Sequence, residues 1–372
     1  MKQGWEYKKL GDCTQILDSQ RKPVTKKDRT GGIYPYYGAT GIQDYVDKYI
    51  FDGRYALVGE DGAKWSAFEQ SAFIIEGKSW VNNHAHVLKP HDFLVDTFLI
   101  YFLNYSDLDS YISGAIVRKL TQASLRNIEI PLPPKSTQLA IVSELDKINE
   151  LIRLKKEQLK DFDNLAQSIF YEMFGDPVEN EMGWEVKKLG EVCSVGTGST
   201  PNRKNKDFYE NGIYPWVKST EVCNLPIYSV EEYITQEALD KTNCTLYPQN
   251  TILMAMYGQG KTRGQIGLLK IEACTNQAVA AIVPTKEVVD ENYICLHLML
   301  MYEHIRNMAR GGNQANLNLS IVKSIQIILP PLPLQHLFAQ CIEQIEHQKA
   351  EVQKAIADLE TLLASRMQYW FE

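Results

Sequence analysis

A double proline followed by a long amphipathic run occurs twice in this chain, and this repeat limits the possible fold more than any other feature. Pro133–Pro134 precede the run 138–174, and Pro330–Pro331 precede the run 335–371. In both runs apolar residues recur at alternating steps of four and three, which is the spacing of a coiled-coil seam. The seam residues are Ile141, Leu145, Ile148, Ile152, Leu159, Phe162 and Ile169 in the first run, and Ile342, Ile345, Val352, Ile356, Leu359 and Leu363 in the second.

Each run predicts a single long helix that needs a partner. A helix of about 33 residues, rising about 1.5 Å per residue, is about 50 Å long. A stripe this narrow is covered best by another helix, and the other copy is the obvious candidate. Because both copies belong to one chain, we expect them to lie antiparallel about a pseudo-twofold axis. The alternative is that each stripe packs on its own globular neighbour, but that arrangement does not require stripes of matched length and phase.

The rest of the chain repeats as well, which identifies it as a tandem duplication. The segment Gly4–Gly11 returns as Gly183–Gly190, and Gly32–Pro35 returns as Gly212–Pro215. Two further pairs match, the weaker first: Asn83–Ala85 with Asn276–Ala278, and Ile128–Pro134 with Ile325–Pro331. Each half therefore has a variable globular part followed by the shared helix.

The expected fold class is α+β, with two mixed α/β domains in pseudo-twofold tandem repeat, separated by two long antiparallel coiled-coil helices. Apolar runs ending in glycine turns predict strands at 55–59 and 251–255, and helical spacing predicts helices at 96–105 and 291–308. Gly175 and Pro177 follow the first long helix as a C-cap and a breaker. The expected segments are 1–131, a globular domain; 132–177, a helix; 178–328, a second globular domain; and 329–372, a second helix.

The position of the charge matters more than its total. The chain carries a formal net charge of −7. Residues 136–176 hold five basic and eight acidic side chains, and residues 335–372 hold three and six, so the helices account for most of the excess. The globular parts are nearly neutral and can carry basic patches, whereas acidic helices indicate protein partners rather than phosphate.

Polar and basic clusters at matching places in the two halves are the candidate DNA contacts, since cations suit phosphates and amide or hydroxyl groups suit base edges. In the first half they are Arg21, Lys22, Lys26, Lys27, Arg29, Tyr34, Tyr36, Tyr37, Thr40, Lys64, Asn83, Arg118, Lys119 and Gln122. In the second half they are Ser199, Thr200, Arg203, Lys204, Lys206, Lys218, Ser219, Thr220, Gln259, Lys261, Arg263, Gln265, Asn313, Gln314 and Asn316. Any one cluster alone could be a solvated loop or capping and turn chemistry. Their recurrence favours a binding function.

The sequence contains no pattern that predicts catalysis or a metal site. Residues 258–262 resemble the end of a phosphate-binding loop, but Ala255 stands where its first glycine belongs. The double prolines lack the flanking amide and aromatic residues of the adenine methyltransferase tetrapeptide. The seven cysteines include no C-x-x-C pair, and the histidines have no ligand spacing. We therefore expect no catalytic residues, no metal and no cofactor in this chain. The opening residues lack a signal-peptide core, which predicts a cytoplasmic, non-membrane protein.

Taken together, the duplicated Gly-Trp-Glu-x-Lys-Lys-Leu-Gly opening, the Pro-Pro…Gln entry to each helix and the terminal helix repeat resemble the specificity (S) subunits of type I restriction-modification systems. The resemblance spans the whole chain. It implies two target-recognition domains, each for one half of an interrupted double-stranded DNA site, and two helices that bind two methyltransferase subunits. S-adenosylmethionine would then be carried by the methyltransferase, and restriction/translocase subunits would join the full complex.

Two other functions compete with this interpretation. A self-sufficient methyltransferase or nuclease would need the cofactor and tetrapeptide motifs that the sequence lacks. A coiled-coil scaffold without a DNA function would explain the helices but not the paired polar loops.

Overall fold

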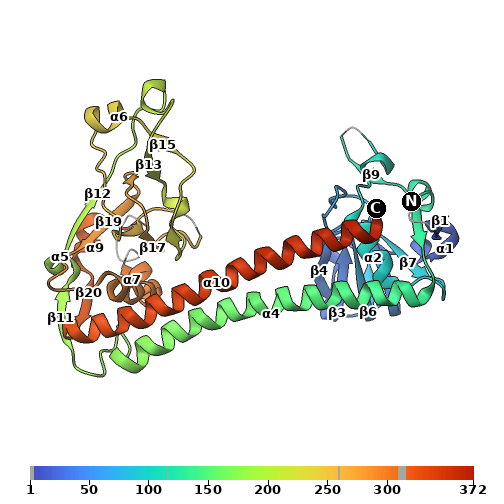
Figure 1. Ribbon diagram of the computed structural model, residues 1–372, viewed down its shortest axis with the longest axis horizontal. Helices are drawn as coiled ribbons and strands as arrows, with labels where there is room; N and C mark the ends of the chain where they lie inside the picture. The colour runs from blue at the N-terminus through green and yellow to red at the C-terminus, as the bar shows by residue number, and fades with distance from the viewer. Residues whose placement is uncertain (1–3, 115, 259, 309–315) are drawn as a thin grey trace. The chain divides into compact units, whose positions relative to one another are not determined.

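The computed structural model describes residues 4–114, 116–258, 260–308 and 316–372 and consists of two units. One comprises Met1–Glu157 with Gln353–Glu372, and the other Gln158–Val352. Each long helix therefore contributes to both units. The helix after the first double proline is α4 (Lys135–Phe174), and the helix after the second is α10 (Leu332–Phe371), as the seam spacing predicts (Figure 1).

The first unit is built on a six-stranded sheet in the order β2-β7-β5-β6-β3-β4. All neighbouring strands are antiparallel except β3 and β6, which are parallel. A separate antiparallel pair, β1 with β10, leads into α4. The elements are β1 Glu6–Lys9, α1 Leu10–Cys13, β2 Thr14–Ile16, β3 Gly31–Gly38, β4 Gly41–Val46, β5 Phe51–Gly59, β6 Ala72–Val81, β7 Ala85–Pro90, α2 Asp96–Tyr105, β8 Ile112–Ser113, β9 Lys119–Leu120, α3 Gln122–Arg126 and β10 Glu129–Leu132.

The second unit repeats this topology with one break and one added strand, β14, which pairs with β17. Its strands follow the orders β12-β19-β16-β17-β14 and β15-β13-β18. Strands β17 and β18 together take the place of β6. The strand is interrupted between them, because Lys270 N donates to Ile227 O and Ala273 pairs with Tyr247. The elements are β11 Glu185–Lys188, α5 Leu189–Val192, β12 Cys193–Thr197, β13 Tyr214–Val217, β14 Pro226–Ile227, β15 Tyr233–Ile234, α6 Gln236–Lys241, β16 Ile252–Ala255, β17 Ile266–Leu269, β18 Cys274–Thr275, β19 Val279–Pro284, α7 Glu291–Leu300, α8 Tyr302–Met308, α9 Leu319–Ser324 and β20 Gln326–Leu329.

The two long helices pack antiparallel in each unit. In the first, Arg366 of α10 and the Trp370 indole both bond to Glu144 of α4, and Lys156 pairs with Glu360. In the second, Lys349 pairs with Asp163 at 2.9 Å. All the predicted seam residues are buried or half-buried. Lys349 interrupts the seam without leaving it, since its side chain is 16% exposed and has two carboxylate partners, Asp163 and Glu346.

A buried glutamine fixes the start of each long helix. Gln138 accepts a hydrogen bond from Val95 N at 2.8 Å and donates to Pro133 O at 2.9 Å. Gln335 makes the same pair of bonds with Asp290 N and Pro330 O, at 2.9 and 2.8 Å. Both side chains are fully buried. The glutamine after each double proline thus ties the long helix to the segment just before α2 or α7.

Most expected elements are present, with two corrections. The helix 96–105 and the strand near 251–255 match α2 and β16, but the helix expected at 291–308 is interrupted at Met301, which ends α7 with ψ near 8°. The repeat alignment around Asn83 is shifted by one residue. Asn82, not Asn83, corresponds to Asn276, because each accepts a hydrogen bond from the backbone N–H two residues later.

Candidate DNA interface

The basic loop of the first unit, residues 21–29 (basic loop 1), has exposed lysines and anchored arginines. Lys22, Lys26 and Lys27 are exposed. Arg29 lies over the Tyr36 ring, 4.1 Å from its centre, and pairs with Asp44 at 3.1 Å. The tyrosine itself is 1% exposed, so it belongs to the core and is not a surface contact.

The basic loop of the second unit, residues 199–206 (basic loop 2), has a similar arrangement. Arg203 lies over the rings of Trp216 and Tyr209, 4.8 Å from each centre, and forms an ion pair with Glu232. Lys204 and Lys206 are exposed. On the strand side, Lys218 is held by Glu231 at 2.6 Å and by Glu232 at 2.9 Å.

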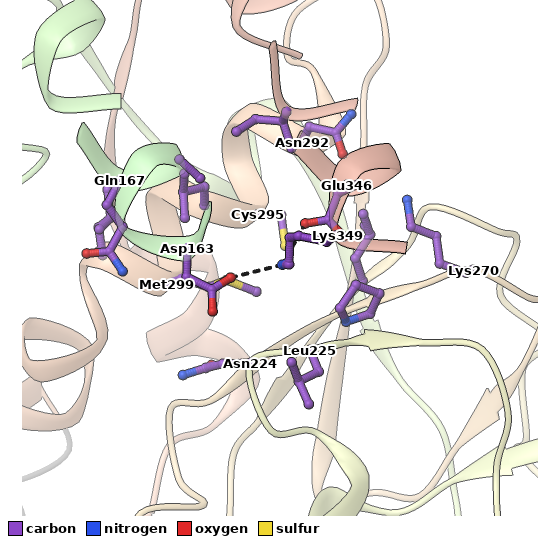
Figure 2. Close-up of a pocket in the computed structure, with 16 residues that line it drawn as sticks. Asp163, Gln167, Asn224, Leu225, Lys270, Asn292, Cys295, Met299, Glu346 and Lys349 are labelled. Carbon is purple, nitrogen blue, oxygen red and sulfur yellow. Dashed lines mark hydrogen bonds and ion pairs between the residues drawn. The ribbon is translucent and has the colours of Figure 1, made fainter. Parts of the chain in front are cut away.

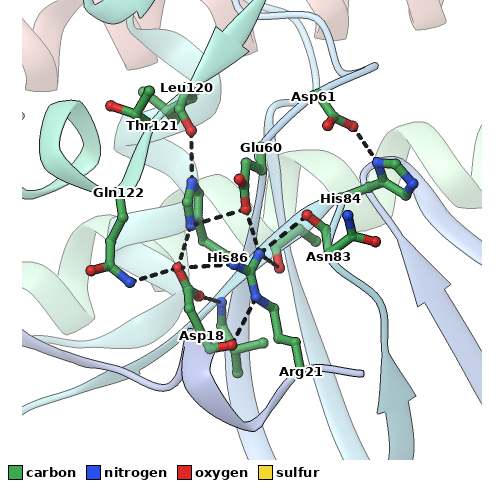
Figure 3. A network of polar contacts seen from close by, with 12 residues as sticks. Asp18, Arg21, Glu60, Asp61, Asn83, His84, His86, Leu120, Thr121 and Gln122 are labelled. Carbon is green, nitrogen blue, oxygen red and sulfur yellow. Dashed lines mark hydrogen bonds and ion pairs between the residues drawn. The ribbon is translucent and has the colours of Figure 1, made fainter. Parts of the chain in front are cut away.

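Arg21 is part of a buried polar network (Figure 3). Its guanidinium bonds to Asp18 and Glu60 and to the Ala85 carbonyl, and its side chain is 12% exposed. His86 contacts Asp18 at 2.6 Å and the Leu120 carbonyl at 2.8 Å. The network therefore joins basic loop 1 to strands β5 and β7 and to the end of β9.

Two predicted DNA contacts, Lys119 and Gln122, complete this network. Lys119 pairs with Glu60 at 2.7 Å, and Gln122 donates to Asp18 at 2.9 Å. Burial would raise the pKa of Asp18, but hydrogen bonds from His86 and Gln122 outweigh it and leave the pKa below its usual value. The pKa of Glu60 is likewise lowered, because bonds from Lys119 and Arg21 outweigh burial.

The same network contains three side chains of metal-ligand type. Oxygen or nitrogen atoms of Asp18, Glu60 and His86 lie within 4.8 Å of one another. Both carboxylates already have cationic partners in Arg21 and Lys119, which supply the charge that a metal ion would supply. The arrangement is therefore an internal ion-pair network that shapes the loop.

Two side chains of α8 hold the glycine-rich turn of the second unit, which includes Gly260 and Lys261. Tyr302 donates to Lys261 O at 2.6 Å, and Arg306 donates to Gly260 O at 2.8 Å. Lys261 is exposed, while Arg263 and Gln265 are half-buried. In the first unit, the corresponding turn carries Lys64, which is exposed and pairs with Glu69.

The remaining predicted contacts divide by exposure, and three lie outside the described residues. Thr40, Asn83, Thr200, Thr220 and Asn316 are exposed, as is Arg118, which pairs with Asp109. Tyr34, Tyr37, Ser199 and Ser219 are half-buried. Gln259, Asn313 and Gln314 lie outside the part of the chain that the structure describes.

The acidic partners of these arginines are not among the residues predicted from the sequence. Four carboxylates decide which cations are available to bind DNA: Asp44, Glu232, Asp18 and Glu60. A pattern of basic residues gives no indication of them. One signal was present: Asp44-Tyr45-Val46 and Glu232-Tyr233-Ile234 repeat the order acid, tyrosine, β-branched residue.

A pocket of about 340 Å³ lies within the second unit, between the long helices and α7 (Figure 2). Leu225, Met299 and Ile342 contribute apolar surface, and the Lys349–Asp163 ion pair lies at one side. The pocket lining includes no predicted DNA contact. Among the described residues, no helix is apolar over a stretch long enough to cross a bilayer.

Two copies of one α/β domain, each with a basic loop and each joined to a long helix of a paired coil, define a tandem recognition protein. The family model for the type I restriction modification DNA specificity domain matches residues 2–161 and 181–361. The chain belongs to this family, and the resemblance inferred from its motifs is confirmed. It is therefore a DNA specificity subunit of the type I restriction-modification class, and nothing in the comparisons favours a scaffold without a DNA function.

Known proteins resemble the chain over nearly its full length. A Haemophilus influenzae protein, provisionally named as a type I restriction enzyme specificity subunit, is 29% identical over 92% of this chain and 87% of its own. The MjaIX specificity subunit of Methanocaldococcus jannaschii is 21% identical over 96% and 90%. The crystal structure of the S subunit from M. genitalium shares the fold, with a TM-score of 0.61 and 14% identity over 100% of this chain and 98% of that one.

Proposed function

We propose that each globular domain recognises one half of an interrupted, asymmetric site in double-stranded DNA, while α4 and α10 set the distance between the halves. The supporting observation is that equivalent backbone positions carry different side chains in the two domains. Leu120 N donates to Glu60 O, and Leu317 N donates to Met256 O, so these positions correspond. Lys119 is thus replaced by the exposed Asn316, and, because Asn82 corresponds to Asn276, the exposed Asn83 is replaced by the exposed Gln277. One scaffold with two different polar surfaces fits two different half-sites.

Binding would divide between two kinds of contact. Exposed lysines of the basic loops would neutralise phosphates, which fixes the position of the protein without selecting sequence. Exposed side chains such as Asn83 and Thr200 would contact base edges in a groove. The half-sites face the same side of the duplex when they are about one helical turn apart from centre to centre.

Catalysis would reside in the partners. We propose that two methyltransferase subunits bind the acidic helices and carry S-adenosylmethionine, that restriction/translocase subunits join the full complex, and that the complex acts in the cytoplasm. The purified chain should therefore transfer no labelled methyl group to DNA, and adding the methyltransferase encoded with it should start the transfer. Transfer by the chain alone would contradict the proposal, as would a light-scattering mass that shows no association with that methyltransferase.

The recognition itself can be tested by selecting DNA from a pool of randomised duplexes. The full chain should enrich a bipartite sequence with two unlike halves separated by a fixed spacer. Enrichment of a single uninterrupted site, or no enrichment over the starting pool, would contradict the proposal.

A further inference from the structure

Both domains contain the same three-part contact, in which an arginine lies on an aromatic ring and pairs with a carboxylate. In the first unit these are Arg29, Tyr36 and Asp44. In the second they are Arg203, Trp216 and Glu232. We refer to each set as an arginine clamp. Tyr36 and Trp216 are the same position of the repeat, since each follows a Gly-Ile-Tyr-Pro segment.

The acidic partner also occupies the same place in both sheets. Asp44 stands directly opposite Tyr36 in the β3–β4 pair. Glu232 stands opposite Trp216, whose backbone N–H donates to Glu232 O at 3.0 Å. The close strand approach is shared too, because a Cβ on Gly32 or Gly212 would come within 2.3 or 2.6 Å of the facing backbone. The clamp is therefore a duplicated feature of the fold.

The two arginines come from different positions in their loops. The contact is therefore not simply a residue that both copies kept after the duplication. Arg29 follows a short 3-10 turn, Lys26–Asp28, whereas Arg203 precedes the corresponding turn, Lys206–Phe208. The loops differ in length and sequence, yet a guanidinium lies on the same ring in both domains. A common role accounts for this recurrence.

Each clamp ring also holds the backbone of its loop. The Tyr36 hydroxyl accepts from Val24 N at 3.0 Å, and Arg29 Nε donates to Val24 O at 3.1 Å. In the second unit, Trp216 Nε1 donates to Ser199 O at 3.1 Å. The clamp thus ties its basic loop to the sheet at more than one point.

The exposed lysines lie beside these ties. Lys26 and Lys27 fall between Val24 and Arg29, and Lys204 and Lys206 come one and three residues after Arg203. The Lys206 side chain is 83% exposed, and the carboxylate of Glu210 lies 3.5 Å from its Nζ. These exposed lysines can meet a phosphate, which for Lys206 would replace an ion pair at the surface of the domain.

The clamp arginines, in contrast, already have carboxylates. Arg29 is 15% exposed beside Asp44, and the hydrogen bond from Arg203 lowers the pKa of Glu232, so both members of that pair are charged at neutral pH. The Arg203 side chain is 49% exposed, but Glu232 balances its charge, so a phosphate would compete with a carboxylate that is already in place. An arginine whose charge is balanced inside the domain adds little to the field that attracts DNA.

We propose that Arg29 and Arg203 are positioning residues for DNA recognition. Each fixes its basic loop against the sheet, so that neighbouring lysines meet the phosphates and the domain is held in register on its half-site. This inference rests on the proposed function of the two domains. It assigns the arginines a role different from the phosphate contact expected of basic loop residues.

The test uses charge-balanced pairs in the full chain. Arg203→Gln with Glu232→Gln removes the second clamp and leaves the net charge unchanged, and Arg29→Gln with Asp44→Asn does the same in the first unit. Lys204→Ala with Lys206→Ala is the matched comparison. Two measurements are made: the salt dependence of binding to one arbitrary-sequence duplex, and the sequences enriched from a randomised duplex pool.

The lysine and clamp variants should differ in both measurements, the salt dependence and the selected sequence. The lysine variant should lower the slope of log K against log salt by about 0.9 per lost phosphate contact and still select the wild-type sequence. Each clamp variant should keep the wild-type slope but lose sequence preference in one half of the site. The two clamp variants should affect opposite halves, so the intact half serves as the internal control for folding.

Other outcomes would overturn the inference. A slope reduced by about 0.9 in a clamp variant would mean that the arginine itself contacts phosphate. Unchanged preference in both halves, or a loss in both halves by either variant, would show that the clamp does not position one domain. If the wild-type chain itself enriched no bipartite site, the proposed function would fail instead.

Discussion

His297 and Phe102 occupy the same position of the repeat, and only one of them can titrate. Val95 N donates to Gln138 and Asp290 N donates to Gln335, so Val95 and Asp290 are equivalent residues. Counting from them along α2 and α7, Phe102 corresponds to His297. His297 is fully buried against Phe170 and Tyr293, and no described residue forms a hydrogen bond with its Nε2. Burial lowers the pKa of His297 to about 3. The residue is therefore an aromatic core side chain that stays neutral when folded.

This neutrality predicts a loss of stability at mildly acidic pH. An unfolded histidine binds a proton below about pH 6.5 and the folded one does not, so the free energy of unfolding falls as pH drops below 6.5, by about 2 kcal/mol at pH 5. His297→Phe should remove this contribution, which urea unfolding at pH 7.5 and pH 5 will measure. The exposed His347→Gln variant should keep the wild-type pH dependence. An equally steep loss in the phenylalanine variant would contradict the assignment.

At the scale of the element, the start of each long helix depends on one buried glutamine. Gln335→Leu would leave Asp290 N and Pro330 O buried without their partner, and an unsatisfied buried polar group costs about 1–3 kcal/mol. We expect about 2–4 kcal/mol of destabilisation in urea unfolding, and the same for Gln138→Leu. The exposed Gln344→Leu on the same helix should change stability by less than about 0.5 kcal/mol. Equal effects at positions 335 and 344 would show that the buried bonds are dispensable.

At the scale of the whole molecule, the repeat predicts that half of the chain can pair with itself. Phe174 packs on Tyr293 in the second unit, and Phe371 packs on Phe98, the counterpart of Tyr293, in the first. In a dimer of residues 178–372, Phe371 of each copy would take the place of Phe174 of the intact chain. Burying the seam residues would contribute roughly 1.5–3 kcal/mol per large side chain. With its methyltransferase, this dimer should modify an inverted repeat of one half-site. A monomeric fragment, or methylation at another pattern, would show that the halves are not interchangeable.

One substitution should strengthen that dimer. In the intact chain Arg366 pairs with Glu144, but the residue that corresponds to Glu144 in the second copy is Cys341. Cys341→Glu would restore the ion pair twice in the dimer, and at about 0.2–1 kcal/mol per exposed pair the dissociation constant should fall by about 2- to 30-fold at low salt. Cys341→Gln is the neutral control. Analytical ultracentrifugation of both variants measures the difference, and equal constants would mean that Arg366 does not face this position across the dimer.

The sequence alone determined the duplication, the two long helices and the family. These features depend on local periodicity and on repetition, which survive in a single sequence because every turn of a helix obeys the same spacing. The double proline, the glutamine after it and the seam residues could all be identified without coordinates. The matched basic loops could be located in the same way.

Only the tertiary structure decided which charges are available. Asp44 and Glu232 reach their arginines through strand pairing, and Asp18 meets His86 across the sheet, so chain distance gives no indication of these contacts. A charge acts on a ligand only if no nearby opposite charge balances it, and that depends on neighbours brought together by the fold. Arg21 and Arg29 have the same sequence signature as Lys26, yet the structure holds both arginines in ion pairs and leaves the lysine exposed.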